Sequence, residues 1–124
     1  MKVFISQPMT GLTEEEILSA RKQARDNIIA VYGDDVKIID NYYNDLYRQN
    51  VEQSMDGVVN SWDVFWLSES LNGMSEADLI WFVDGWQHSR GCTVEHLCAS
   101  LYGIDMEFET LATRKDGSYK YGKQ

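Results

Sequence analysis

The alternation of apolar and polar residues at the start of the chain predicts a strand, a loop and a helix. Residues 3–5 form a short apolar run that ends in the loop of residues 6–11, which contains the only proline of the chain. Thr13 and Glu16 have the spacing of a capping box, and apolar residues then recur at helical spacing until Gly33. These patterns predict a buried first strand, a shaped loop and a first helix.

The middle of the chain contains two further predicted strands. Residues 36–39 are rich in β-branched side chains and predict a second strand that ends at Asp40. Residues 42–61 are polar and aromatic without a clear period, and we predict a loop with some helix in it. Residues 62–73 predict a helix. The most apolar run, residues 79–83, predicts a central parallel strand that is covered on both faces.

A last predicted helix follows a glycine-containing polar segment, residues 85–92, which we interpret as a loop. Thr93 is suited to cap this helix, and Gly103 is suited to end it. The helix has one apolar face, which we expect to be buried and which consists of Val94, Leu97, Cys98 and Leu101.

Strands that alternate with helices predict one α/β domain of the flavodoxin-like or Rossmann-like type, a small three-layer sandwich with a mostly parallel sheet of four to five strands. Residues 106–111 supply the last strand, the domain comprises residues 1–114, and residues 115–124 form a polar tail or an edge hairpin. Ligands of such sheets bind beyond the carboxyl ends of the strands. We therefore expect three loops to meet in one crevice: residues 6–11, 40–43 and 84–93.

Charge and cysteine content narrow the function classes. The net charge is -9, and no run of Lys and Arg forms a stripe, which disfavours duplex nucleic acid and anionic membranes as partners. We find neither a signal-peptide pattern nor a run of about 20 apolar residues that would span a membrane. Two cysteines are too few for a disulfide scaffold or a zinc cluster. We expect a protein of the reducing cytoplasm that binds a small molecule without a metal ion or cofactor.

Glu95 is the first candidate for chemistry because it opens the helix that follows the loop of residues 85–92. On the first helical turn, the helix dipole and the free amide groups favour an ionised carboxylate, as a nucleophile or a stabiliser of an oxocarbenium ion requires. The same position is also explained if Glu95 only complements the helix dipole, as acidic residues in first turns commonly do. The position alone leaves both interpretations open.

Polar residues of the three loops are candidate binding groups. Asp84 lies at a strand end, where its carboxylate either accepts from a base or a ribose hydroxyl or only forms a turn. Ser89 and Arg90 either hold a phosphate or carboxylate group or lie in a solvated loop. The remaining candidates for binding are Ser6, Gln7, Pro8, Met9, Thr10, Gly11, Asp40, Gly85 and Gly91.

Aromatic residues and one cysteine have two interpretations each. Trp86, Tyr42 and Tyr43 either stack on a base or close the core. Cys92 lies near a helix start, which can lower the pKa of a thiol, although no histidine partner can be assigned to it. We assign Trp62, Trp66 and Trp81 to the core or to contacts between subunits.

Three segments together resemble the nucleoside 2-deoxyribosyltransferase superfamily, in its bacterial and phage branch. They are VFISQPMTG at residues 3–11, SLNGMSEAD at residues 70–78 and GWQHSRGCTVEH at residues 85–96. The resemblance spans roughly residues 1–104. It implies a nucleotide-type pocket in which Glu95 attacks the anomeric carbon of a 2-deoxyribonucleoside, displaces the base and forms a sugar ester. Water or another base then resolves this ester, in a sequence of steps that is similar to that of retaining glycosidases.

The departures from this resemblance concern the groups around the glutamate. Phe4 stands where characterised members usually carry Tyr, and Ser70 stands where they carry Asp. Ser70 and Asp84 are therefore the candidates that orient Glu95 or the substrate. Thr10 replaces an Arg of the nucleoside-monophosphate hydrolases, so the need for a 5′-phosphate stays open. Related proteins complete their sites across a dimer interface, which implies a homo-oligomer.

Three functions from different classes are open at this point. The first is an enzyme that cleaves or transfers the N-glycosidic bond of a 2-deoxynucleoside or deoxynucleotide. The second is a non-catalytic module that binds or senses a nucleotide, favoured by the missing Tyr and Asp. The third is an oligomeric scaffold, suggested by the aromatic-rich middle of the chain.

Overall fold

The structure, a computed structural model, describes residues 1–109 and contains four strands and four α-helices in this range. The elements are, in order, β1 (Lys2–Ser6), α1 (Glu14–Tyr32), β2 (Lys37–Ile38), α2 (Asp45–Ser54), α3 (Trp62–Met74), β3 (Leu79–Phe82), the short 3₁₀ helix η1 (Trp86–His88), α4 (Arg90–Tyr102) and β4 (Asp105–Phe108). The predicted tail of residues 115–124 and the end of the predicted last strand lie outside the described residues.

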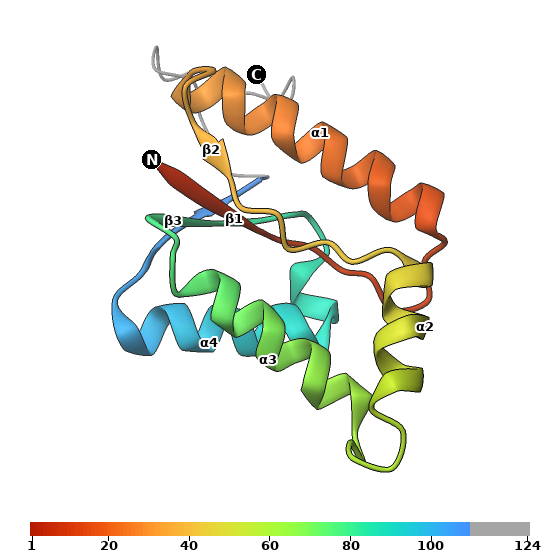
Figure 1. The fold of residues 1–124 in the computed structure, drawn as a ribbon. Helices are drawn as coiled ribbons and strands as arrows, with labels where there is room; N and C mark the ends of the chain where they lie inside the picture. The colour runs from red at the N-terminus through yellow and green to blue at the C-terminus, as the bar shows by residue number, and fades with distance from the viewer. Residues whose placement is uncertain (110–124) are drawn as a thin grey trace.

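The strands form one all-parallel sheet in the order β2-β1-β3-β4. In the register, Val3 lies opposite Leu79 and Ser6 lies opposite Phe82. Helix α1 covers one face of the sheet, whereas α3 and α4 cover the other (Figure 1). The prediction of a flavodoxin-like or Rossmann-like three-layer sandwich is thereby confirmed, with four strands in the sheet.

The two central strands, β1 and β3, send alternate side chains into two separate cores, as the period of a strand requires. On the α1 side the core contains Val3, Ile5, Ala24, Ile28, Val31, Leu79, Trp81 and Val83. On the other side it contains Phe4, Met74, Ile80, Phe82 and Ala99. Every residue of β3 is buried, which confirms the prediction of a central strand covered on both faces.

Helix α1 begins and ends where the sequence predicts. The Thr13 hydroxyl accepts from the backbone N–H of Glu16 at 3.1 Å, and the Glu16 carboxylate accepts from the N–H of Thr13 at 2.9 Å. Gly33 follows the helix with φ 98°, a conformation that favours glycine. The buried face of α1 is apolar except for Arg21, which the apolar pattern does not predict.

Helix α4 begins one turn earlier than the sequence predicts. Its cap is Ser89, whose hydroxyl accepts from the backbone N–H of Cys92 at 3.3 Å, and Thr93 lies inside the helix. The expectation that Thr93 caps the helix is wrong because Ser89 offers the same hydroxyl earlier, and Gly91 is helical instead of marking a loop. Glu95 consequently lies on the second turn of the helix, not on the first.

The face that α4 turns towards the sheet also differs from the prediction. The buried residues are Cys92, Glu95 and Ala99, and Cys98 of the expected apolar face packs partly buried against the core, whereas the other three residues of that face are exposed. The exposed fractions are 39% for Val94, 56% for Leu97 and 70% for Leu101. The helix is therefore rotated so that a carboxylate faces the sheet, and three apolar side chains face outwards.

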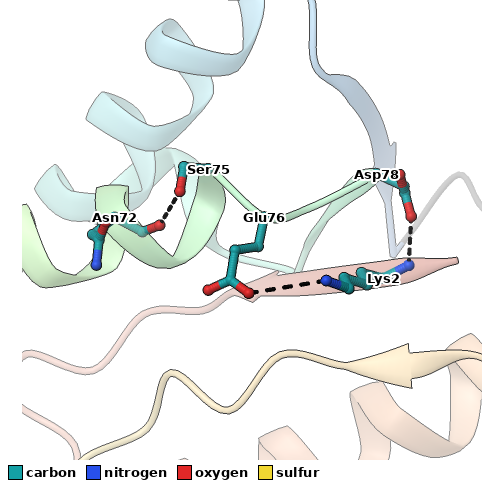
Figure 2. Close-up of polar contacts among 5 residues, drawn as sticks. All are labelled: Lys2, Asn72, Ser75, Glu76 and Asp78. Atoms are coloured by element: carbon teal, nitrogen blue, oxygen red, sulfur yellow. Dashed lines mark hydrogen bonds and ion pairs between the residues drawn. The ribbon is translucent and has the colours of Figure 1, made fainter.

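Polar contacts connect the segments at the amino-terminal ends of β1 and β3 (Figure 2). The backbone N–H of Lys2 donates to the Asp78 carboxylate at 2.7 Å, and the Lys2 ammonium lies 4.0 Å from the Glu76 carboxylate. The Ser75 hydroxyl donates to the carbonyl of Asn72 at 2.6 Å where α3 ends. These contacts lie at the opposite end of the strands from the loops that we predicted to bind a ligand.

Within residues 1–109, no helix has the length and apolar character that crossing a bilayer requires.

Candidate functional site

A cavity of about 580 Å³ lies beyond the carboxyl end of β1. Its walls come from the loop before α1, the segment between β2 and α2, and the facing sides of α3 and α4. The volume lies in the range that small-molecule sites occupy. The carboxyl ends of parallel strands are also where ligands bind in folds of this class.

Three polar side chains meet at one wall of this cavity. The Ser6 hydroxyl, at the end of β1, donates to Oε1 of Glu95 at 2.6 Å. The hydroxyl of Ser70, on α3, hydrogen-bonds the same carboxylate. Glu95 is only 6% exposed, yet it lines the cavity. We call Ser6, Ser70 and Glu95 the carboxylate site.

The charge state of Glu95 is set by burial. Burial raises the pKa of this carboxyl from the ordinary 4.5 to about 7, although the hydroxyls of Ser6 and Ser70 act in the opposite direction. The expectation that the helix start favours the ionised form is therefore wrong, because Glu95 lies one turn too far along and is desolvated. At neutral pH, the ionised and protonated forms are present in comparable amounts.

Cys92 lies next to this site and is 2% exposed. Burial raises the pKa of its thiol, and the hydroxyls of Ser6 and Ser89 lower it by less. The depressed pKa that a helix start can produce is not found. Cys92 is thus a buried neutral thiol at physiological pH, which suits packing and not nucleophilic attack.

The structure brings most of the predicted site residues together around the cavity. Lining residues are Gln7, Met9, Thr10, Gly11, Ser70, Ser89, Arg90, Gly91 and Glu95. The Ser6 hydroxyl donates a hydrogen bond to the Glu95 carboxylate. Pro8 and Asp40 are not among the lining residues, and Asp40 is exposed. Its neighbour Asn41, which belongs to the predicted loop of residues 40–43, lines the cavity instead.

Asp84, Gly85 and Trp86 lie elsewhere, around a second cavity of about 430 Å³. The chain turns at Gly85, with φ 88°, and η1 follows directly. Trp86 stacks on His96 with ring centroids 4.5 Å apart and also packs on Phe82. The expected single crevice is therefore divided, and Asp84 does not share a cavity with Glu95.

A buried polar network behind the first cavity was not predicted. Arg21 donates to the side-chain oxygen of Gln7 at 3.2 Å, to that of Asn41 at 2.8 Å and to the carbonyl of Ile39 at 3.1 Å. It thereby ties α1 to the ends of β1 and β2. The sequence contained a sign of this network, because Arg21 occupies a position at helical spacing among the apolar residues that form the buried face of α1.

Aromatic rings lie at the wall formed by α2 and α3, and an ion pair links α3 to α4. Tyr43 and Trp66 line the cavity with ring centroids 5.5 Å apart. The guanidinium of Arg48 lies over the Trp66 ring, 5.1 Å from its centroid. Arg90 pairs with Asp63 at 3.3 Å, and both side chains are exposed. The assignment of Trp66 to core or subunit contacts overlooked this position beside the cavity.

The side chains at the cavity wall permit several kinds of chemistry. Among residues 1–109, no three His, Cys, Asp or Glu side chains are grouped so that they would hold a metal ion. A buried carboxylate with two hydroxyl partners can act as a nucleophile, a proton carrier or a hydrogen-bonding anchor. Comparison of the chain with protein-family models, curated proteins and solved structures gave no match.

Proposed function

We propose that this protein cleaves or transfers the N-glycosidic bond of a 2-deoxynucleoside or deoxynucleotide, with Glu95 as the nucleophile. The observation that carries the proposal is a single buried carboxylate, held by the Ser6 hydroxyl at 2.6 Å, on the wall of a cavity of about 580 Å³. A fixed and buried carboxylate suits attack on a sugar carbon that develops positive charge. The resemblance of the chain to the nucleoside 2-deoxyribosyltransferase superfamily supports the choice of substrate.

The reaction proceeds in two displacements at the anomeric carbon. In the first, a carboxylate oxygen of Glu95 bonds to this carbon, the bond to the base breaks, and the base leaves with the electron pair and takes up a proton from solvent. In the second, water or another base bonds to the same carbon, loses a proton and releases the carboxylate. The configuration at the sugar carbon is retained.

Ser6 and Ser70 act in this proposal as positioning residues, because they touch the carboxylate. Their hydroxyls hold Glu95 in one orientation, and both favour its ionised form. Ser6 supplies the orienting hydroxyl that a Tyr at position 4 would supply in the resembling family. Phe4 itself is fully buried in the core and offers no hydroxyl. Asp84, which lines the other cavity, has no part in orienting Glu95 in this scheme.

A non-catalytic nucleotide-binding or sensing module is the second candidate. It is favoured by the pKa of Glu95, which is raised to about 7, because a carboxyl that is partly protonated at neutral pH can donate a hydrogen bond to a ligand. In this function Glu95 anchors the ligand and forms no covalent bond.

The test is incubation of the protein with 2-deoxynucleosides and deoxynucleotides, followed by chromatography for the released base and by thermal shift for binding. Glu95→Gln keeps the shape of the side chain and removes its charge, so it should abolish base release while leaving ligand binding largely in place. Glu76→Gln is the matched control, because this exposed carboxylate lies at the opposite end of the sheet (Figure 2).

The outcomes separate the candidates. Base release by the parent protein, together with its loss in Glu95→Gln, supports the enzyme. A thermal shift without base release, weakened in Glu95→Gln, supports the binding module. Base release that persists at a near-normal rate in Glu95→Gln contradicts the nucleophile assignment.

We further propose that the protein forms a homo-oligomer through α4. Val94, Leu97 and Leu101 follow helical spacing, point away from the sheet and are exposed. Single exposed apolar residues are common, whereas three on one face of one helix are typical of a contact surface. Val94 also lines the cavity, so a second copy packed on this face would border the site.

A further inference from the structure

Two buried amide groups face the cavity that contains Glu95. Gln7 follows β1, Asn41 follows β2, and both line the cavity. Their exposed fractions are 6% and 8%, so both side chains are more than nine-tenths buried. We call Gln7 and Asn41 the amide pair.

Arg21 fixes which atoms of the amide pair remain available. A guanidinium carries only donors, so its partners must be acceptors. Nη1 of Arg21 donates to Oε1 of Gln7 at 3.2 Å, and Nη2 donates to Oδ1 of Asn41 at 2.8 Å. If either amide were flipped, its N–H groups would oppose those of Arg21. The oxygen of each amide is therefore committed to Arg21.

The nitrogens of the amide pair retain one donor each. An amide nitrogen carries two N–H groups. Nε2 of Gln7 donates to the carbonyl of Ile17 at 3.1 Å, and Nδ2 of Asn41 donates to the carbonyl of Ile5 at 3.2 Å. Within residues 1–109, no other acceptor bonds either nitrogen. The second N–H of each amide is therefore available to an acceptor that the ligand supplies.

We propose that the amide pair is a subsite for a hydrogen-bond-accepting oxygen of the ligand, which receives one N–H from each amide. This inference rests on the proposed function, because the amide pair shares its cavity with Glu95. Arg21 adds to the attraction: it is buried, and although the charge of Asp40 acts on it, no carboxylate of residues 1–109 lies within ion-pair distance. Its positive charge favours an electron-rich oxygen, either the neutral carbonyl of a base or an anionic phosphate oxygen.

The test replaces a donor by an acceptor of the same shape. Gln7→Glu places a carboxylate beside Arg21, with which it can pair, so the fold should be retained. Titration calorimetry with 2-deoxynucleosides and their 5′-monophosphates, in a Glu95→Gln background that prevents turnover, should show affinity weakened by about tenfold or more. Gln23→Glu makes the same change of charge on the exposed side of α1 and should leave the affinity unchanged.

The choice of ligands identifies the oxygen. If the acceptor is a phosphate oxygen, Gln7→Glu weakens binding of the 5′-monophosphates and of 2-deoxyribose 5-phosphate more than binding of the nucleosides. If it is a base carbonyl, nucleosides and monophosphates lose the same factor, and 2-deoxyribose 5-phosphate loses nothing.

Two results would overturn the inference. One is affinity of Gln7→Glu within twofold of the parent for every ligand, which leaves the proposed function standing if the parent releases base. The other is a parent that binds none of these ligands, which overturns the proposed function as well. If Gln7→Glu does not fold, ¹⁵N NMR of the parent replaces it: ligand must shift the side-chain NH₂ signals of Gln7 and Asn41, and unmoved signals contradict the subsite.

Discussion

At the scale of single residues, the proton on Glu95 governs the proposed chemistry. A nucleophile must be ionised, and burial raises the pKa of Glu95 to about 7. We therefore expect kcat/KM to rise with pH through about 7 and to level off above it, because that profile reports the ionisation of the free enzyme. A profile with its midpoint near the ordinary value of 4.5 would contradict the assignment.

Ser6→Ala should move this profile in a known direction. The Ser6 hydroxyl lowers the pKa of Glu95, so its removal should raise that pKa and shift the midpoint to higher pH. The measurement is kcat/KM across pH for the parent and the variant. Ser68→Ala, an exposed serine on the same helix as Ser70, serves as the control and should leave the midpoint in place.

The same pKa predicts how stability depends on pH. Because the native state holds the Glu95 proton up to about pH 7, whereas the unfolded chain releases it near 4.5, ionisation of the unfolded chain lowers the stability of the fold as pH rises between these values. Glu95→Gln should therefore raise the free energy of unfolding by on the order of 1–3 kcal/mol at pH 8, with little effect at pH 4.

Urea unfolding at the two pH values measures this difference. Glu76→Gln, which changes an exposed carboxylate in the same way, should have no comparable effect at either pH. A stabilisation by Glu95→Gln that is equal at pH 4 and pH 8 would show that the pKa of Glu95 is not raised in the native state.

At the scale of elements, the start of α4 determines where Glu95 lies. Ser89 caps this helix, so Ser89→Ala should lower the free energy of unfolding by about 1 kcal/mol. Thr93→Ala is the comparison, because Thr93 would be the costlier loss if the helix began at that residue. Urea unfolding that shows a greater loss for Thr93→Ala would contradict the cap at Ser89.

Local signals were sufficient to predict the elements whose ends are made by neighbouring residues. The capping box of Thr13 and Glu16 and the stop at Gly33 gave α1, and the apolar run of residues 79–83 gave the central strand. The start of α4 was missed because Gly91 reads as a loop residue, although it is helical. The rotation of α4 was missed because hydrophobicity alone does not predict that a glutamate is buried.

The features of the site that the sequence did not predict depend on contacts between segments that are distant in the chain. Glu95 and Ser70 were singled out from the chain, but the division of the cavities, which separates Asp84 from Glu95, depends on the packing of Trp86 against His96 and Phe82. The role of Arg21 could not be predicted either, because it depends on which loops pack against α1.

At the scale of the whole molecule, the outer face of α4 predicts self-association. Light scattering at working concentration should show a dimer or a higher oligomer, and the double variant Leu97→Lys, Leu101→Lys should be a monomer. Both leucines are exposed in the protomer, so the monomer should stay folded. Loss of the association alone, without loss of the fold, would locate the contact surface on α4.

Leu18→Lys provides the control for this prediction. Leu18 is 45% exposed on α1, which covers the other face of the sheet, so the variant should associate like the parent (Figure 1). A parent protein that is monomeric, or a double variant that still associates, would contradict the assignment of α4 as the contact surface.

The hydrogen bond between Ser6 and Glu95 joins residues that are 89 positions apart. The chain must therefore close a loop of this length before the carboxylate meets its partner, and such non-local contacts form slowly compared with single helices. Until the loop is closed, Glu95 remains solvated and retains an ordinary affinity for protons. During refolding, uptake of one proton near pH 6 should accompany the closure of the sheet and lag behind the formation of the helices.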